Sequence, residues 1–535
     1  EAELFYDLSE PVVCRCGSPV HFRRVDDQWF INYADENLTA RTSEHCRGMD
    51  IYPSEYANNV HGVLEWFRER ACVRQGNWLG TRFPFDDKWI IEAISDSTLY
   101  PVYYLVSLYA NRGEIKPEQM TESFFDHVIL GEGDVKKVSQ STGISVDLLR
   151  RIAADVSYWY PLDLNLGGKE HMTVHFPAFL FNHTAVLPQD MWPRGILVNW
   201  YITSKAGKIS KSKGGAQPIP GAASKFGVDS LRLYYAHIAS PFTDVEWDED
   251  AVTSYRTRVD RLLKMVEELL GAGRSGELRA IDRWIQSRVD ANVRSCLEFM
   301  RSFDLRQMAS VVYFDMVNDL RWYLRRGGDN SLVIRDVLNK WVRMMAPVTP
   351  HIAEEMWEMI GGEGLVSAAD YPEPDDDVQS LVSEAGESLL RELMTDVKEI
   401  LRVTGMDAHR VVVYTSPDWK NRIQSQAVRL GLEDALDIPS LTKWAMADAD
   451  IRSQGKAVPD FIKKLVPELQ KRSRGDLESL SVPLNEKNHL EEAVGFLATE
   501  LGAEVLVLSA DDPDLHDPQG KVRFAVPGRP ALFIE

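Results

Sequence analysis

Apolar residues recur at helical spacing through the middle of the chain. The clearest run consists of Val259, Leu262, Leu263, Met265, Val266, Leu269 and Leu270. Comparable runs cover residues 311–324 and 333–345, and a period near 3.6 residues is typical of helices that bury one face. The glycine pairs at 327–328 and 361–362 are typical of helix ends. We therefore expect a bundle of helices over residues 251–380.

The flanking segments carry other patterns. Residues 86–250 alternate helix-like and strand-like stretches, which is typical of α/β domains. Strand-like runs at 411–414 and 505–508 are separated by helix-like runs at 459–472 and 490–501, which predicts a small α+β domain. The expected regions are an irregular segment of residues 1–85, the α/β region of 86–250, the helical region of 251–380 and the α+β region of 381–535, which begins with a linker.

Composition excludes several classes of protein. The 535 residues are 44% hydrophobic and include 14 Trp, which is enough for several cores. No apolar run approaches the roughly 18 residues that a membrane-spanning helix needs. The chain opens without a signal-peptide pattern, and its five cysteines suggest no disulfide framework. We therefore expect a cytoplasmic protein with no membrane partner.

Charge is unevenly distributed along this acidic chain. The formal net charge is −21, yet residues 251–345 carry 17 Lys and Arg against 12 Asp and Glu, and the remainder carries 43 against 69. A locally basic segment favours contact with phosphates, because screening limits the reach of distant charges to about 10 Å. A solvated basic face on a helical bundle would give the same pattern.

The segment GKISKSKGG at residues 207–215 predicts a cationic loop. Its residues Lys208, Ser210, Lys211 and Ser212 stand between glycines with almost no apolar anchor. Ammonium groups and successive backbone N–H groups can hold a polyphosphate and stabilise charge that develops on it. A solvated linker is the alternative interpretation of such a run.

A second candidate site is the segment LNLGGKEHMTVH. The pattern predicts a strand that ends at Gly167 and Gly168 and a helix that follows, so that backbone N–H groups face a ligand. At a spacing of four, His171 and His175 would share one helical face. Three interpretations stay open: a zinc site, structural histidines, and a nucleotide contact.

The cysteines near the start suggest a possible metal half-site. Cys14 and Cys16 flank one residue and precede Gly17, as in half of a zinc knuckle. His45 or Cys46 could complete it, and two free thiols in a loop are the alternative.

Several segments, in order along the chain, resemble class I aminoacyl-tRNA synthetases. The loop KISKS resembles the family's KMSKS loop, and FGVDSLRLYYAHIASP at 226–241 resembles the helix that follows it. The run GGKEHMTVH is similar to the GGxEHxxxH element, which lines the adenylate pocket in that family. Further similar segments lie at 72–84, 89–100, 192–199, 345–357 and 527–535. Together they cover essentially the whole chain and match the leucyl type of archaea and eukaryotes; an isoleucyl or valyl enzyme is a minor alternative.

The resemblance implies a fold and a reaction. The fold would be the second half of a class I Rossmann-like catalytic domain, an anticodon-binding helical bundle and a small α+β C-terminal domain that contacts tRNA. The reaction would be ATP-dependent activation of leucine to leucyl-adenylate and transfer to tRNA(Leu). ATP, with Mg²⁺ as its usual companion, would be the cofactor, and no DNA partner is expected.

The resemblance also implies site residues. Lys208 and Lys211 would hold the leaving pyrophosphate. The nucleotide or adenylate would contact Gly167, Gly168, His171, His175, Asn199, Ser210 and Ser212. The leucine side chain would lie near Ser97, Thr98 and Tyr100. Basic residues expected at tRNA are Arg321, Arg325, Lys463 and Lys464; for the last two, a solvated helix end is an equal alternative.

Two departures from the family bear on activity. The 535 residues contain neither the family's HIGH motif nor room for its editing domain, so we expect the C-terminal half of a leucyl-tRNA synthetase that needs a separate HIGH-bearing N-terminal half. Trp200 stands where family members usually have glycine beside the adenine, and could stack on the base or fill its site. The alternative function is therefore a degenerate paralogue that binds tRNA without aminoacylation.

Overall fold

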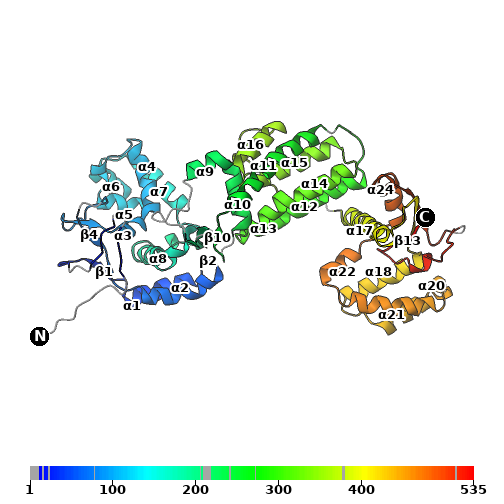
Figure 1. Cartoon of the computed structure of the whole chain (residues 1–535). Helices are drawn as coiled ribbons and strands as arrows, with labels where there is room; N and C mark the ends of the chain where they lie inside the picture. Colours follow the sequence, from blue (N-terminus) through cyan, green and yellow to red (C-terminus); the bar gives the residue numbers. More distant parts are fainter. Residues whose placement is uncertain are drawn as a thin grey trace. The chain divides into compact units, whose positions relative to one another are not determined.

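The computed structural model describes most of the chain (Figure 1). The described residues are 11–14, 17–21, 25–76, 79–204, 207–208, 219–239, 243–271, 273–375, 380–512 and 515–535. The chain forms two compact units, one of residues 1–219 with 238–249 and one of residues 220–237 with 250–535. Within the described ranges, no helix is long and apolar enough to cross a membrane.

The first unit is centred on a parallel sheet of three strands. β7 (Gly195–Asn199) lies between β2 (Asp50–Tyr52) and β6 (Asn165–Gly168). The register pairs Ile51 with Ile196 and Gly167 with Val198. The carboxyl ends of β6 and β7 therefore lie side by side.

Three helices bury this sheet. α8 (His175–Val186) is apolar on nearly all sides and places Phe176, Phe179, Leu180 and Phe181 in the core, as expected of a helix that is buried all round. α1 (Glu36–Cys46) and α2 (Ser54–Trp66) complete that core with residues such as Tyr56 and Val60. The burial of α8 fixes its N-terminus at the edge of the sheet where β6 ends.

Residues 93–159 are helical, so the expected alternation of strands and helices does not hold there. This segment forms a small helical cluster around Val106, Phe124, Leu149 and Ile152. Its helices are α3 (Ala93–Ser97), α4 (Tyr100–Asn111), α5 (Glu122–Val128), α6 (Val135–Thr142) and α7 (Val146–Trp159). Short strand pairs make up the rest of the unit: β1 (Phe30–Ile31) with β3 (Arg70–Ala71), β4 (Val73–Gln75) with β5 (Trp89–Ile91), and β8 (Ile202–Ser204) with β9 (Gly207–Lys208) and β10 (Val245–Glu246).

The expected helical bundle is present in the second unit. Its core contains Leu262, Met308, Trp341 and Met345 among many other buried residues. The helices are α9 (Ile219–Phe226), α10 (Val228–Ile238), α11 (Glu249–Leu270), α12 (Ala280–Arg301), α13 (Leu305–Ser310), α14 (Met316–Arg325), α15 (Ser331–Met345) and α16 (Pro350–Met359).

A π-helical turn, Val311–Asp315, joins α13 to α14. Two of its carbonyls accept hydrogen bonds from side chains: Val312 from the Trp341 indole at 2.8 Å and Tyr313 from Arg258 at 3.3 Å. A π-turn shifts the backbone hydrogen-bond ladder, and such turns are frequent at functional sites. Phe314 of this turn contacts helices α10 and α11, stacking on His237 with centroids 4.4 Å apart and lying 3.8 Å from the Arg258 guanidinium carbon.

The two glycine pairs end helices α14 and α16 in the same way. Gly328 N–H donates to the Tyr323 carbonyl and Gly362 N–H to the Trp357 carbonyl, both at 2.8 Å. The preceding glycines, Gly327 and Gly361, have φ of +76° and +79°. These are the six-to-one bond and left-handed residue of a Schellman cap.

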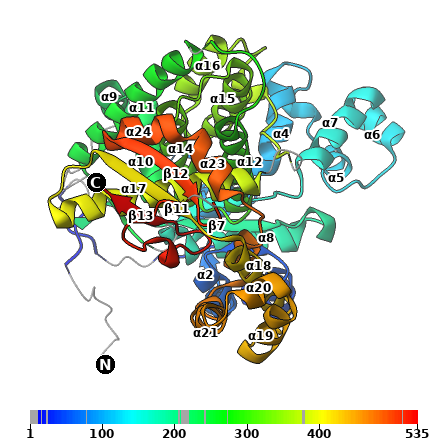
Figure 2. The same ribbon diagram turned by 90° about the vertical axis from the view of Figure 1, so that its right-hand side faces the viewer.

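The last part of the chain packs a three-stranded sheet against the long helix α17 (Leu381–Thr404) (Figure 2). Strand β11 (Arg410–Thr415) is central, parallel to β12 (Glu504–Ser509) and antiparallel to β13 (Ala531–Ile534). Val411 and Val413 face α17, whereas Val412 and Tyr414 face the segment before β13, because successive side chains alternate across a strand. Both predicted strands are confirmed. The helices are α18 (Asp418–Leu432), α19 (Ile438–Ala447), α20 (Ala449–Ser453), α21 (Ala457–Leu469), α22 (Arg474–Leu480), α23 (Glu486–Glu492) and α24 (Val494–Leu501).

A buried carboxylate holds α17 to the bundle. Glu387, only 1% exposed, accepts three hydrogen bonds of 3.0–3.3 Å from Arg326 and one of 2.8 Å from the Trp322 indole. The His489 ring lies 3.7 Å from the same carboxylate. This cluster links α14, α17 and α23 within the second unit.

Candidate functional site at the carboxyl edge of the parallel sheet

Two glycines end β6 at the edge where α8 begins. A Cβ on Gly167 would lie 2.7 Å from Phe176 and 2.9 Å from the His171 ring, so this position requires glycine. Ligands of open parallel sheets bind outside the carboxyl ends of the strands. The sheet therefore places the predicted GGKEH residues at the edge where a ligand would bind.

The expectation that the Gly168 N–H faces a ligand is wrong. Gly168 N–H, predicted to face a ligand, donates to Nδ1 of His171 at 2.9 Å. Because Nδ1 accepts this bond, a neutral His171 carries its proton on Nε2 and offers that N–H outward. The hydrogen-bond donor at this edge is the imidazole, held in place by the glycine backbone.

The two histidines are close together, but not for the predicted reason. His171 lies in a 3₁₀ turn, Lys169–Met172, whereas His175 is the first residue of α8, so they do not share one helical face. Their rings meet edge to face with centroids 5.4 Å apart. Burial, reinforced by His171, lowers the pKa of His175. At neutral pH His175 is thus an uncharged hydrogen-bonding group.

A lysine that the sequence analysis did not single out completes the site. Lys169 Nζ lies 4.9 Å from the Trp200 ring centroid and 5.7 Å from that of Tyr201. Trp200 is half-buried against the core that contains α8, and Asn199, at the end of β7, is exposed. Trp200 thus lies beside the 3₁₀ turn that carries Lys169 and His171, with the Lys169 ammonium group over its ring. The position of Lys169 directly after two glycines was the available signal.

The residues predicted near leucine lie at the junction of α3 and α4. Thr98 is fully buried and its hydroxyl accepts from the Asn182 amide at 2.7 Å, while that amide oxygen accepts from Tyr33 at 3.1 Å. Ser97 ends α3, and Tyr100 is 42% exposed at the start of α4. Thr98 is therefore a fixed internal contact, and Tyr100 is the member of the group open to solvent.

The cationic loop falls mostly outside the described residues. The Lys208 backbone pairs in β9 with Thr203 of β8. Ser210, Lys211 and Ser212 lie outside the described residues, as does the Lys208 side chain. Their predicted contact with pyrophosphate and nucleotide stays a prediction.

Among the described residues, the possible zinc half-site finds no free second pair of ligands. Cys14 is exposed, in a turn where Gly17 N–H donates to the Cys14 carbonyl at 2.8 Å, and Cys16 is outside the described residues. Burial raises the pKa of the Cys46 thiol to about 12, and the His45 ring bonds the Pro193 carbonyl at 2.8 Å. Both candidate partners are thus engaged in the fold. In the part of the chain that the structure describes, no three His, Cys, Asp or Glu residues are grouped to hold a metal ion.

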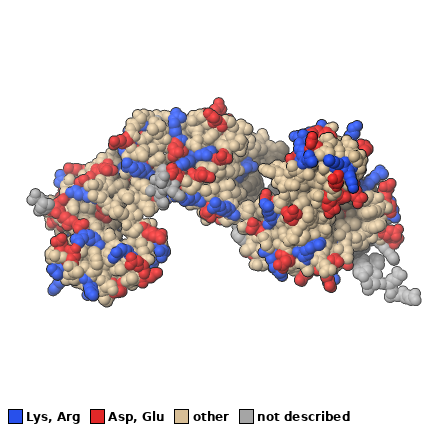
Figure 3. Space-filling view, turned by 180° about the vertical axis from the view of Figure 1, so that it is seen from behind, with Lys and Arg blue, Asp and Glu red and all other residues tan. Residues whose placement is uncertain are grey.

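The four residues predicted at tRNA differ in their surroundings. Arg325 pairs through both ends of its guanidinium with Glu500, whereas Arg321 is exposed. Lys463 and Lys464 are exposed on α21. On the face shown in Figure 3, basic and acidic side chains are interleaved, and acidic side chains do not form one continuous patch on that face.

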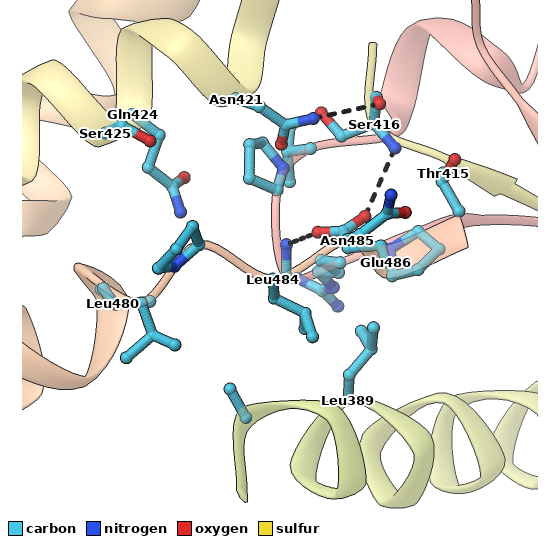
Figure 4. Close-up of a pocket in the computed structure, with 18 of the residues that line it drawn as sticks. Leu389, Thr415, Ser416, Asn421, Gln424, Ser425, Leu480, Leu484, Asn485 and Glu486 are labelled. Carbon is cyan, nitrogen blue, oxygen red and sulfur yellow. Dashed lines mark hydrogen bonds between the residues drawn. The ribbon is translucent and has the colours of Figure 1, made fainter. Parts of the chain in front are cut away.

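Lys464 lines a large cleft between α17 and helices α18, α21 and α22. Its volume is about 1870 Å³, above the 300–1,000 Å³ typical of small-molecule sites. Glu486, mostly buried, accepts from Ser416 N–H at 3.5 Å and from Gly528 N–H at 2.5 Å on one wall (Figure 4). Burial raises the pKa of this carboxyl group. The carboxylate, at the start of α23, joins the loops at Ser416 and Gly528 and is occupied by their backbone donors.

Two family models match segments of the chain. Residues 166–262 match "tRNA synthetases class I (M)", and residues 282–411 match "Anticodon-binding domain of tRNA ligase". The first segment contains the GGKEH edge and the cationic loop, and the second contains most of the bundle.

Curated relatives match the whole chain. The leucine–tRNA ligase of Methanosarcina barkeri is 39% identical over 538 residues, which is 100% of this chain and 55% of the relative. That of Pyrococcus horikoshii is 34% identical over 550 residues, again 100% and 55%. The chain thus spans about half the length of the curated relatives it matches. Among solved structures, Mycobacterium tuberculosis methionyl-tRNA synthetase with methionyl-adenylate aligns with TM-score 0.48 and 17% identity, over 67% of each chain.

Proposed function

Since the chain belongs to the leucyl group of class I aminoacyl-tRNA synthetases, we propose that it supplies about half of a leucine–tRNA ligase. The other half, which carries HIGH, would come from the same polypeptide or a separate one. In the reaction, the leucine carboxylate attacks the α-phosphorus of ATP, forming leucyl-adenylate and releasing pyrophosphate. A terminal ribose hydroxyl of tRNA(Leu) then takes the leucyl group and AMP leaves.

The observation that carries the proposal is the arrangement at the carboxyl edge of the sheet. Gly167 allows the His171 imidazole to pack against the backbone, and His171 Nε2–H points away from that contact. The His171 imidazole, anchored through Nδ1, lies beside the uncharged His175 ring and suits hydrogen bonding to an adenylate, and Lys169 adds a positive charge. Positioning and charge stabilisation are what reaction at phosphorus requires.

The remaining roles follow the family. Lys208 and Lys211 would neutralise the leaving pyrophosphate, and Tyr100 would approach the leucine. Mg²⁺ would arrive bound to the ATP phosphates and offset their charge. No step is assigned to zinc, because the described residues around Cys14 offer no set of ligands for it.

Leucine-dependent ATP–pyrophosphate exchange tests the proposal. The chain would be assayed alone and with the HIGH-bearing half of a relative. We expect exchange only in the complete assembly, reduced on the order of 10²–10³-fold by Lys211→Ala, by analogy with the loss of one transition-state donor. Lys136→Ala, an exposed lysine on α6, is the matched control and should retain full exchange.

Trp200 favours the second candidate function, a paralogue that binds tRNA without aminoacylation. Its ring lies under the Lys169 ammonium group, beside the turn that carries His171, where a glycine would leave space. Association of the two halves without exchange, in wild type and in Trp200→Gly, would leave this second function as the better description. Exchange restored by Trp200→Gly alone would identify the ring as the obstacle.

A further inference from the structure

The short helix α3 has little apolar surface to hold it in place. All five of its residues are described, and none of them is buried; Ile94 packs partly against the core that contains α8. A helix this short is not stable on its own, because nucleating it costs more than its few hydrogen bonds return. The position of α3 therefore depends on contacts made near its two ends.

The start of α3 is held at the surface. The Glu92 side chain caps the helix by accepting two backbone N–H groups at 2.8 and 3.3 Å, and it pairs with Arg74 of β4. Asp96 accepts from the Thr81 hydroxyl at 3.1 Å. The contacts with Arg74 and Thr81 are exposed, so water competes with them and each adds little to stability.

The other end of α3 is held in the interior of the first unit. Thr98, which directly follows α3, is fully buried and accepts from the Asn182 amide at 2.7 Å. The amide oxygen of Asn182 accepts from the Tyr33 hydroxyl at 3.1 Å. Burial raises the pKa of Tyr33 to about 12, so this hydroxyl keeps its proton at neutral pH. The Tyr33–Asn182–Thr98 chain thus runs from the loop after β1, through α8, to the end of α3 (Figure 1).

Asn182 is the central member of this chain of hydrogen bonds. Its amide accepts from one hydroxyl and donates to the other, which an apolar side chain cannot do. The Tyr33 ring is fixed in turn by the rings of Phe67 and Phe181, with centroids 5.2 and 5.4 Å away. Loss of the amide would leave two buried hydroxyls without this partner, which is costly in the interior.

Thr98 controls where α4 begins. Leu99, the first flanking residue of α4, makes no side-chain capping bond, and Tyr100 follows it with its ring open to solvent. Further along, Val106 and Tyr109 anchor the helix in a separate cluster. The first turn of α4 therefore takes its place from the buried residue before it.

We propose that Asn182 is a positioning residue for the amino-acid pocket, where through Thr98 it fixes Ser97 and Tyr100 for the side chain of leucine. The inference rests on the proposed function, in which leucine lies near Tyr100, and adds a residue from a different part of the chain. Asn182 lies seven residues after His175 on α8, or about 10 Å along the helix. One helix thus bears on both the nucleotide edge and the amino-acid pocket.

The test compares variants by two measurements. Amide hydrogen exchange is followed over residues 99–103 of the full chain, and the KM values for leucine and ATP are measured in the assembly with the HIGH-bearing half of a relative. Asn182→Ala removes the amide, Thr98→Val removes the hydroxyl, and Thr98→Ser keeps it. Asn59→Ala is the matched control, an exposed asparagine of α2 whose amide donates to the Glu55 carbonyl of its own helix at 2.7 Å.

We expect Asn182→Ala and Thr98→Val to speed amide hydrogen exchange over residues 99–103 and to leave it unchanged in α6. In the assembly, both variants should raise the KM for leucine by roughly 10–100-fold, since a displacement of about 1 Å can cost that much, and leave the KM for ATP unchanged. Their preference for leucine over isoleucine and methionine should fall. Thr98→Ser and Asn59→Ala should behave as wild type.

Two results would overturn the inference. Unchanged amide hydrogen exchange over residues 99–103 in Asn182→Ala would show that other contacts fix the start of α4. Equal increases in the KM for leucine and for ATP would show a general loss of stability rather than positioning of one substrate. If Asn182→Ala does not fold, Thr98→Val decides by the same criteria, because it keeps nearly the same shape.

Leucine protection separates this inference from the proposed function. In the wild-type assembly, added leucine should slow amide hydrogen exchange over residues 99–103, and Asn182→Ala should lose that protection. Protection without ATP–pyrophosphate exchange would support the pocket and reject the ligase. ATP–pyrophosphate exchange without protection would place leucine elsewhere and overturn the inference alone, and the absence of both would reject both.

Discussion

His183 is a fully buried imidazole in the middle of α8. Its Nδ1 lies 2.8 Å from the Phe179 carbonyl, which can only accept, so Nδ1 carries the proton. Its Nε2 then accepts from the Tyr160 hydroxyl at 3.3 Å. The neutral ring is fully hydrogen-bonded, and burial lowers its pKa to about 4.

Because His183 is buried and uncharged, we expect the first unit to lose stability in acid. As pH falls from about 6.5 toward 4, the unfolded chain binds a proton that the folded unit does not, so stability falls by roughly 1.4 kcal/mol per pH unit. Imidazole NMR should find His183 titrating near 4, and His183→Gln should flatten the pH dependence of urea unfolding. A titration midpoint near 6.5 would contradict the burial argument.

Gly328 and Gly362 are positions where any side chain would collide with a neighbouring ring. A Cβ would overlap the Tyr323 ring at Gly328 and the Trp357 ring at Gly362. We expect either glycine-to-alanine change to lower the free energy of unfolding by about 1–3 kcal/mol, since overpacking forces the ring to move. Chemical denaturation measures this. The control is Gly495→Ala in α24. An added Cβ there would meet no atom within 4 Å beyond its own helix backbone and chain neighbours, so the change should raise the free energy of unfolding slightly.

At the scale of elements, α10 is fastened to the start of α16. Asp229, 7% exposed, accepts from Ile352 N–H at 2.7 Å and lies 2.8 Å from Nδ1 of His351. Arg232, one turn on, donates to the Val348 and Pro347 carbonyls at 2.8 and 2.9 Å. Two of the segments that resemble the family in sequence, 226–241 and 345–357, are therefore bonded to each other.

Because Asp229 joins α10 to α16, we expect removal of its carboxylate to destabilise the second unit. Asp229→Ala leaves a helix N–H without its acceptor, and should cost about 1–3 kcal/mol in urea unfolding of the second unit. Asp260→Ala on the exposed side of α11 should change stability by less than about 0.5 kcal/mol. Equal effects of the two changes would show that the α10–α16 contact contributes little.

Local patterns predicted the elements better than the contacts between them. Strands 411–414 and 505–508 were visible because β-branched residues cluster in short runs, whereas β13 is only four residues long and follows a turn. The edge position of Gly167 was predicted, but Lys169 meets Trp200 across 31 positions and Arg325 meets Glu500 across 175. Contacts between residues so far apart in sequence depend on how the helices pack, and a short stretch of sequence carries no information about that packing.

At the scale of the whole molecule, the two compact units predict two unfolding transitions. Breaking the buried pair of Arg326 and Glu387 leaves an uncompensated charge, which typically costs about 3–5 kcal/mol. Glu387→Gln should therefore lower the melting temperature of the second unit and leave that of the first unchanged. Calorimetry of the full chain would resolve both transitions, and a shift of both by the same amount would show that the units unfold together.

Strand β11 is synthesised well before β12 and β13, the two strands that it pairs with. Arg410 pairs with Glu504, and β13 reaches β11 only at Ala531–Ile534, so the central strand is made long before either neighbour. At about 5–20 residues per second, the ribosome would need roughly 5–20 seconds to deliver β12 after β11. Throughout that interval the backbone of β11 lacks both of its strand partners, so its N–H and C=O groups are open to pairing with other strands while the chain is nascent.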